Sequence, residues 1–139
     1  YTDAKYDRYL VGGVDLSDLP FVFTPKHQFN IGASLTLPVP KSIGDVVLRG
    51  TYSWQDRIYA GDTDPTQPFS FIKSYGLLGA RIDWENVFDS KKVDLSFFAT
   101  NLADKTYRIA IIQQYNASGY TTAIYGEPRM YGMSLRVRY

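Results

Sequence analysis

Apolar and polar residues alternate with a period of two along several stretches of the chain, most clearly from residue 28 to residue 37. Successive side chains of a β-strand point to opposite faces, so this alternation predicts a strand with one apolar and one polar face. The same pattern recurs within residues 46–57, 78–85, 93–100 and 131–139. Helical periodicity is not evident along the chain. The pattern therefore predicts an all-β fold.

Turn-forming residues divide the chain into about six predicted strands, of which the first, within residues 1–10, has the weakest alternation. The predicted connections are residues 11–25, 38–45, 61–70, 89–92 and 113–126. The alternation falters near residues 101–105, where we expect a β-bulge. Long and short connections follow one another in turn. This order predicts an antiparallel meander with long loops at one end and short turns at the other.

The two faces of the predicted strands differ in chemistry. The apolar faces carry aromatic residues near strand ends, among them Trp54, Trp84 and Tyr139. The opposite faces carry charged residues, namely Arg49, Arg57, Arg81, Asp83, Glu85, Asp94, Arg136 and Arg138. Burying unpaired charges costs several kcal/mol each, so the charged faces do not fit the dry core of a small domain. Apolar outer faces and a wet charged interior are typical of a membrane β-barrel.

The alternative is a soluble antiparallel β-sheet that acts as a ligand-binding module and has one solvated face. Such a sheet needs a second layer to cover its apolar face, and the pattern leaves no helix or second sheet for that layer. The longest aliphatic run, residues 109–112, is far too short for a membrane-spanning helix. That shortness does not exclude a barrel, because barrel strands alternate.

Composition narrows the function classes. The chain has 139 residues, a net charge of +1 and no Cys. The small net charge gives no reason to expect a nucleic-acid partner. Without Cys, the chain forms no disulfide and offers no thiolate chemistry. Aromatic residues make up 16 % of the chain, and Tyr, at 12 residues, is the most frequent of them.

Candidate catalytic and metal-binding groups are few. His27 is the only His and is interpreted as a residue at the start of a strand. Asp62 and Asp64 are oxygen ligands suited to a hard cation, but a solvated turn is the preferred interpretation. Asp83 and Glu85 share a face with Arg81, which favours a structural ion network over an acid–base pair. We therefore expect no enzyme activity, no catalytic residue, no cofactor and no metal site.

The long loops are the expected place for ligand contacts. Aromatic side chains there offer flat amphipathic surfaces for a chelate or a sugar. These candidates are Phe69, Phe71, Tyr115, Tyr120 and Tyr125. Arg57 and Lys73 lie near the loop ends and are candidates for contact with an anionic ligand.

Four segments, in order, resemble the C-terminal end of TonB-dependent outer-membrane receptors: TPKHQFNIGASLTLP, YGLLGARIDWE, NLADKTYR and YGEPRMYGMSLRVRY. The residues that carry the last two similarities are Asn101, Leu102, Asp104, Lys105, Tyr107, Gly126, Pro128, Arg129, Tyr131, Gly132, Ser134, Leu135 and Tyr139. The resemblance covers nearly the whole chain. It implies a barrel in the bacterial cell outer membrane.

The resemblance implies a 22-stranded barrel that is filled by an N-terminal plug and imports a scarce ligand with energy passed on by TonB. Ferric siderophores, cobalamin and oligosaccharides are such ligands. Residues 1–139 are then expected to be the last six strands, a fragment without the plug and the earlier strands. The implied partners are outer-membrane lipid, the barrel assembly machinery, the rest of the barrel and plug, TonB through the plug, and an extracellular small-molecule ligand.

The last strand carries a further expectation from the resemblance. Its alternating apolar residues are similar to the signal that the barrel assembly machinery reads on a terminal strand. The residues of this expected assembly signal are Tyr131, Met133, Leu135, Val137 and Tyr139.

Overall fold

The computed structural model of the chain describes residues 1–61, 66–67 and 69–139 and comprises two compact units. The first unit consists of Tyr1–Phe29, Trp54–Tyr75 and Thr106–Gly126. The second unit consists of Asn30–Ser53, Gly76–Lys105 and Glu127–Tyr139. Among the described residues, no helix has the length and apolar character needed to cross a bilayer.

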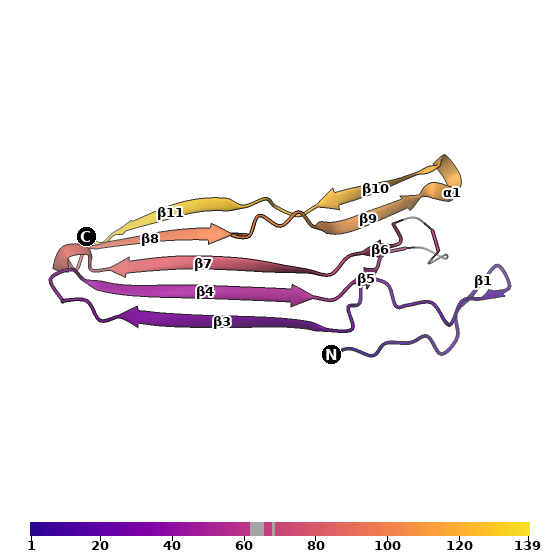
Figure 1. Cartoon of the computed structure of the whole chain (residues 1–139), viewed down its shortest axis with the longest axis horizontal. Helices are drawn as coiled ribbons and strands as arrows, with labels where there is room; N and C mark the ends of the chain where they lie inside the picture. The colour runs from indigo at the N-terminus through magenta and orange to yellow at the C-terminus, as the bar shows by residue number, and fades with distance from the viewer. Residues whose placement is uncertain (62–65, 68) are drawn as a thin grey trace. The chain divides into compact units, whose positions relative to one another are not determined.

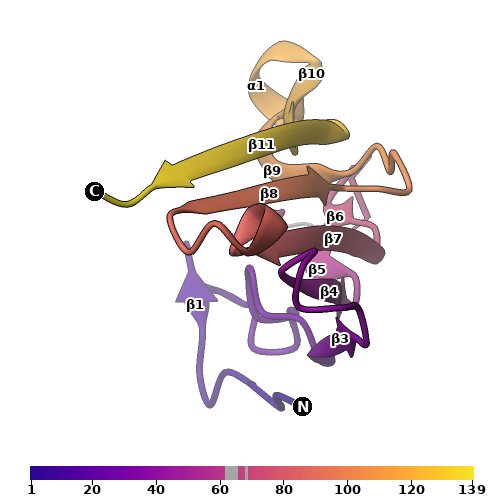
Figure 2. The ribbon, with the colours of Figure 1, turned by 90° about the vertical axis from the view of Figure 1, so that its left-hand side faces the viewer.

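Five long strands form one sheet, and they make up most of the second unit. They are β3 (Gln28–Leu37), β4 (Asp45–Gln55), β7 (Tyr75–Glu85), β8 (Val93–Thr100) and β11 (Met130–Val137). Their order across the sheet is β11-β8-β7-β4-β3, and neighbouring arrows in Figure 1 run in opposite directions. Figure 2 views the sheet from another side. The antiparallel all-β fold class predicted from the alternation is confirmed.

The register of the sheet places like side chains in rows. Met133 lies opposite Phe97, and Phe97 lies opposite Ile82, so an apolar row crosses three strands. One residue further along, Ser96 lies opposite both Ser134 and Asp83, which form a polar row on the other face.

Two aromatic rings lie over glycines of this sheet. A Cβ atom at Gly132 would come within 2.3 Å of the ring of Phe98, its partner in the register. A Cβ atom at Gly76 would come within 2.2 Å of the hydroxyl oxygen of Tyr52. Since real Cβ atoms do not approach other atoms so closely, a larger residue at either glycine would require the ring to move from its present position.

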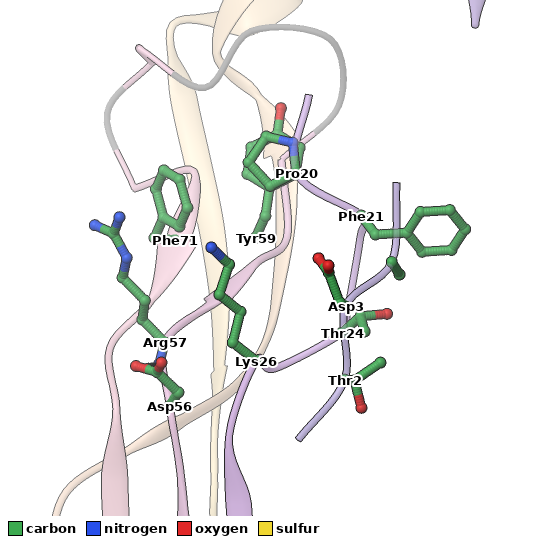
Figure 3. A pocket seen from close by; sticks show the side chains of 11 residues that line it. Thr2, Asp3, Pro20, Phe21, Thr24, Lys26, Asp56, Arg57, Tyr59 and Phe71 are labelled. Atoms are coloured by element: carbon green, nitrogen blue, oxygen red, sulfur yellow. Dashed lines mark hydrogen bonds between the residues drawn. The ribbon is translucent and has the colours of Figure 1, made fainter. Parts of the chain in front are cut away.

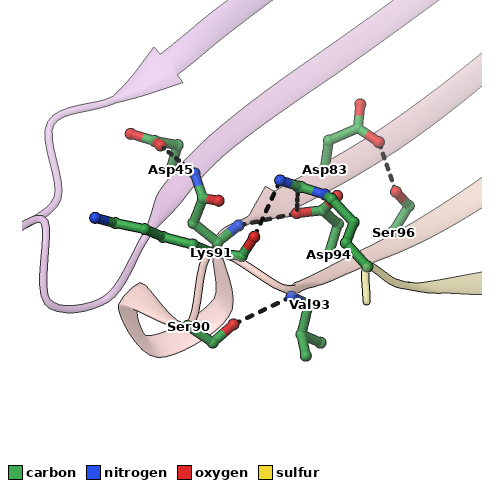
Figure 4. Close-up of polar contacts among 9 residues, drawn as sticks. Asp45, Asp83, Ser90, Lys91, Val93, Asp94 and Ser96 are labelled. Atoms are coloured by element: carbon green, nitrogen blue, oxygen red, sulfur yellow. Dashed lines mark hydrogen bonds and ion pairs between the residues drawn. The ribbon is translucent and has the colours of Figure 1, made fainter.

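The short turns predicted at residues 38–45 and 89–92 are present, and the first is hydrogen-bonded to the end of β7 and to the residue that follows it. The Trp84 indole donates a hydrogen bond to the Ile43 carbonyl oxygen (2.8 Å). The side-chain amide of Asn86 donates one to the Asp45 carboxylate (3.2 Å). Figure 4 labels Asp45 at this end of the sheet together with Asp94, which pairs with Arg138. The turn of η1 (Val87–Asp89) closes this end of the sheet.

The apolar face of the sheet is exposed. Ile31 and Leu135 keep 62 % and 64 % of their surface, whereas Asp83, on the polar face, keeps 8 %. All buried apolar side chains among the described residues lie in the first unit: Ile58, Tyr59, Ala60, Ile72 and Ile111. The sheet therefore buries polar groups and exposes apolar ones, the reverse of a soluble sheet.

The first unit is built from short hairpins. β5 (Ile58–Tyr59) pairs with β6 (Phe71–Ile72), and Ile58, Ala60, Ile72 and Ile111 form a small apolar core against which Tyr75 packs. The prediction of a strand at residues 1–10 was wrong except at its last residue. Leu10–Val11 (β1) pairs with Val14–Asp15 (β2), while Tyr6 stacks between the rings of Tyr9 and Phe21.

The expected β-bulge near residues 101–105 is a turn instead. Asn101 is buried with a positive φ of 46°, and its side-chain amide donates to the carbonyl oxygens of Lys105 (2.9 Å) and Glu127 (3.1 Å). Its side-chain oxygen accepts a hydrogen bond from the Lys105 N–H (2.8 Å). An Asn tolerates this backbone conformation and satisfies the turn through its side chain, so the strand ends here.

The predicted loop at residues 113–126 proved wrong in part, because it contains a strand. β9 (Arg108–Gln114) pairs with β10 (Tyr120–Tyr125), and the single turn α1 (Tyr115–Ser118) closes the hairpin (Figures 1 and 2). The Thr121 hydroxyl donates a hydrogen bond to Gln113 across the pair (3.0 Å). The Tyr, Thr and Ile residues that resembled a loop are also good strand formers.

Candidate functional site

The polar face of the sheet carries an ion network around Asp83. The Asp83 carboxylate accepts hydrogen bonds from Arg49 Nε (3.0 Å), Arg81 Nε (2.6 Å) and the Ser96 hydroxyl (2.7 Å). Arg81 also donates to the Ser96 oxygen (3.0 Å). Two guanidinium groups thus hold one carboxylate, which fits the predicted structural network and leaves no free general base at Asp83.

A second carboxylate on this face is held in the same way. Asp94 accepts hydrogen bonds from Arg138 on both oxygens and from the Asn86 N–H (3.1 Å) (Figure 4). Arg138 also donates to the Lys91 carbonyl oxygen (3.1 Å). These contacts join the end of the last strand to the turn before β8.

A recess in the first unit brings four of the predicted ligand-facing residues together. Arg57, Phe69, Phe71 and Lys73 line a cavity of about 550 Å³, together with Arg108. Ligand cavities in proteins commonly measure about 300–1,000 Å³. The recess is therefore large enough for a small molecule.

The hairpin of β5 and β6 positions the recess. Ile58 lies opposite Ile72, and both are in the apolar core, whereas Phe71 lies opposite Tyr59. Alternation thus turns Phe71 away from the face that Ile72 presents to the core. Arg57 and Lys73 each lie one residue beyond this pairing, so the hairpin brings two cations to the same end.

Ser70 anchors the edge of the recess. It is almost completely buried, its carbonyl oxygen accepts a hydrogen bond from the Ala60 N–H (2.9 Å), and its hydroxyl donates to the Gln67 carbonyl oxygen (2.9 Å). The Gln113 side-chain amide also donates to the Ser70 hydroxyl (3.3 Å). These bonds tie the segment that carries Phe69 and Phe71 to β9.

Both guanidinium groups of the recess lie over aromatic rings. The Arg57 Cζ atom is 4.9 Å from the centre of the Phe71 ring, and the Arg108 Cζ atom is 5.1 Å from that of Phe69. Such contacts contribute about 0.5–1 kcal/mol at exposed sites and orient the guanidinium plane. The N–H groups at the edges of these planes remain suited to bind a ligand.

The charged side chains that line the recess among the described residues are all positive. Among the described residues, no carboxylate oxygen lies within 4 Å of the side-chain nitrogens of Arg57, Lys73 or Arg108. Three like charges around one cavity repel one another, and a bound anion relieves that repulsion. The described lining of the recess therefore favours an anionic ligand over a cationic one.

A second cavity of about 310 Å³ shares Arg57 and Phe71 with the recess but has a mixed lining, with Asp3, Lys26 and Asp56 (Figure 3). Asp56 lies 3.5 Å from the Nδ1 atom of His27. No group of three potential metal ligands is present within residues 1–61, 66–67 and 69–139. Asp62 and Asp64, the candidate cation ligands, lie outside the described residues.

The remaining candidates lie elsewhere. Tyr115, Tyr120 and Tyr125 are exposed on the β9–β10 hairpin and line neither cavity. The residues of the expected assembly signal, Tyr131, Met133, Leu135, Val137 and Tyr139, are all exposed, and the first four alternate along β11.

Arg108 is the charged recess residue that the sequence analysis did not identify. In the sequence it starts an apolar stretch after a turn, and its partner Phe69 is far away along the chain. The one sequence feature that could have indicated Arg108 as a site residue is its position as a lone cation at the start of a strand that follows a turn.

Comparison with known protein families gives one match. Residues 1–102 match the family described as TonB dependent receptor-like, beta-barrel. The matched range includes β3, β4 and β7, most of the recess, and all of β8. Comparisons with curated proteins and with solved structures gave no match.

Proposed function

Since the chain belongs to the TonB-dependent receptor-like β-barrel family, we propose that residues 1–139 form the last strands and outer loops of a transport receptor in the bacterial outer membrane. The family is one of outer-membrane transport, not of catalysis. The receptor takes up a scarce ligand such as a ferric siderophore, cobalamin or an oligosaccharide, with energy delivered by TonB. The complete barrel has 22 strands and encloses a plug.

One observation supports this proposal beyond the family match: the five-stranded sheet exposes its apolar face and buries the Asp83 carboxylate on the other. In a barrel wall, the apolar face contacts lipid and the charged face lines the interior. The Arg49–Asp83–Arg81 network suits such an interior, because each charge has a partner on a neighbouring strand or its own. The exposed apolar face argues against the soluble-sheet alternative, which needs that face covered.

The order of connections supports an orientation. Short turns join β3 to β4 and β7 to β8, whereas residues 56–74 and 101–129 join β4 to β7 and β8 to β11 at the opposite strand ends. In outer-membrane barrels, short turns face the periplasm and long loops face the outside. The recess consists of residues from these long connections, so its proposed role is to contact the imported ligand.

Spin labels are expected to report the two faces directly. In the complete receptor in lipid vesicles, labels at Ile31→Cys and Leu135→Cys should be accessible to lipid-soluble oxygen and shielded from a water-soluble nickel chelate. Labels at the neighbouring Asn30→Cys and Ser134→Cys should show the reverse, because adjacent residues face opposite sides of a strand. Equal accessibility of each neighbouring pair to both reagents contradicts the barrel proposal.

The apolar residues at the end of the chain are proposed to form the barrel-assembly signal. Tyr139 is fully exposed, so its side chain contributes little to the folded sheet. Tyr139→Ala is therefore expected to lower the amount of receptor in the outer membrane severalfold while leaving the thermal stability of the inserted fraction unchanged. Quantitative blotting of membrane fractions and heat-induced unfolding measure the two effects. Normal membrane levels of the variant contradict the signal role.

A further inference from the structure

We infer that the recess of Arg57, Lys73, Arg108, Phe69 and Phe71 binds a small, multiply charged anion with a flat face, an inference that rests on the proposed receptor function. The ligand carries two or more carboxylate or phosphate groups. Neutral ligands, such as uncharged sugars, would leave the three cationic side chains of this recess without a countercharge. The inference thus selects one chemical class among the ligands that outer-membrane receptors import.

Charge is the first argument. Three cationic side chains line one cavity of about 550 Å³, and within residues 1–61, 66–67 and 69–139 no carboxylate oxygen is within 4 Å of any of them. Four described guanidinium groups outside the recess have a carboxylate within 4 Å, among them Arg49 and Arg81, which share Asp83. The recess departs from that pattern, and an anion supplies the missing countercharge.

Geometry is the second argument. Each guanidinium lies over a ring, Arg57 over Phe71 at 4.9 Å and Arg108 over Phe69 at 5.1 Å. The ring holds the guanidinium plane, and the two N–H groups along an edge of that plane match the two oxygens of a carboxylate or phosphate. Lys73 adds a compact charge that accepts several directions of approach. Two planar groups and one point charge fit a ligand with at least two acid groups.

The rings give the third argument. Phe69 keeps 59 % of its surface exposed although its residue type is usually buried. With Phe71 it gives the recess an apolar part of its lining beside the cations. A flat ligand stacks on such a surface and places its acid groups at the cations around it.

Titration calorimetry on the complete purified receptor in neutral detergent tests the inference. The probe is benzene-1,3,5-tricarboxylate, which is flat and carries three acid groups. Benzene-1,3,5-tricarboxamide has the same shape without the charge and is expected to bind at least about tenfold more weakly. The affinity for the tricarboxylate is also expected to fall as salt is added. Equal affinity for the two probes, or no binding of the tricarboxylate, overturns the inference.

Matched variants locate the binding. Arg57→Gln, Lys73→Gln and Arg108→Gln are each expected to weaken tricarboxylate binding about tenfold, the effect of losing one charge-assisted hydrogen bond. Arg8→Gln and Lys5→Gln, at exposed residues of the same unit outside the recess, are the controls and should bind as the wild type does. Unchanged binding in all three recess variants overturns the inference. Compact migration of unheated samples in detergent gels shows that each variant has folded.

Two further measurements separate alternatives. Propane-1,2,3-tricarboxylate has the acid groups without the flat face, and equal binding of it overturns the stacking role of the rings. The phosphates of lipid A offer the same anionic chemistry from the membrane. If lipid A displaces the aromatic tricarboxylate at concentrations below those at which the tricarboxylate itself binds, the recess binds a lipid headgroup, and the inference of a soluble ligand is overturned. A receptor whose spin labels confirm the two faces but that binds no probe retains the proposed function and loses this inference.

Discussion

Replacing Met133 with Arg is expected to prevent most of the receptor from reaching the outer membrane. Met133 lies midway along β11, keeps 70 % of its surface exposed and belongs to the apolar row with Phe97 and Ile82. A cation on the lipid face of a barrel strand costs about 2–4 kcal/mol at the bilayer midplane. An arginine in the middle of the strand cannot offset this free-energy cost by extending its charged group towards the membrane interface. Blotting of outer-membrane fractions measures the loss.

Ser134→Arg is the matched control for this prediction. Ser134 is the next residue along β11, and its side chain faces the other side, opposite Ser96, which hydrogen-bonds to Asp83. An arginine there approaches a carboxylate in a polar interior and should leave membrane levels near those of the wild type. Equal losses for the two arginine variants contradict the assignment of faces. Equal survival of both contradicts it as well.

Replacing Asp83 with Ala is expected to destabilise the folded receptor by about 2–3 kcal/mol, the second large effect. Asp83 is buried and accepts hydrogen bonds from Arg49, Arg81 and Ser96, so its loss leaves two guanidinium groups close together without a countercharge. Breaking a fully buried ion pair costs about 3–5 kcal/mol. The two arginine side chains are about half exposed, and solvent screening lowers the figure. Denaturant unfolding of the receptor from vesicles measures the change.

Two variants serve as controls for the Asp83 prediction. Asp45→Ala removes an exposed carboxylate that accepts one 3.2 Å hydrogen bond from Asn86, so its effect should be within about 0.5 kcal/mol. Arg49→Ala combined with Asp83→Ala should cost less than the sum of the two single changes, because the double variant leaves fewer unpaired charges. Additive costs in that cycle show that Arg49 and Asp83 do not act together.

The period-two alternation predicted the five long strands because each of them has one face with apolar residues and one with polar residues. In β3, for example, Phe29, Ile31 and Leu35 alternate with polar or small residues from end to end. Alternation also predicted the outcome for Asp83, since Arg81 lies two residues away on the same face. These features are local in sequence, and a local pattern suffices to predict them.

Long-range features were not predictable in the same way. Tyr6 and Tyr9 resembled a strand by composition, yet they stack with Phe21, a contact that no period reveals. The sequence predicted separate contacts for Phe69, Phe71, Arg57 and Lys73 but not the recess that joins them. Arg108 was missed because its place beside Phe69 depends on the packing of β9 near β6.

The two ring-over-glycine contacts have a consequence for how the strands find one another. Phe98 fits against Gly132 because that residue has no Cβ atom, and Tyr52 fits against Gly76 for the same reason. A slip of β11 by two residues keeps every side chain on its proper face but puts Met130 or Ser134 where Gly132 belongs. The ring then meets a side chain in space that only a hydrogen atom fills. The close fit of ring and glycine therefore disfavours a shifted strand register, even where the shift would keep the apolar and polar faces in place.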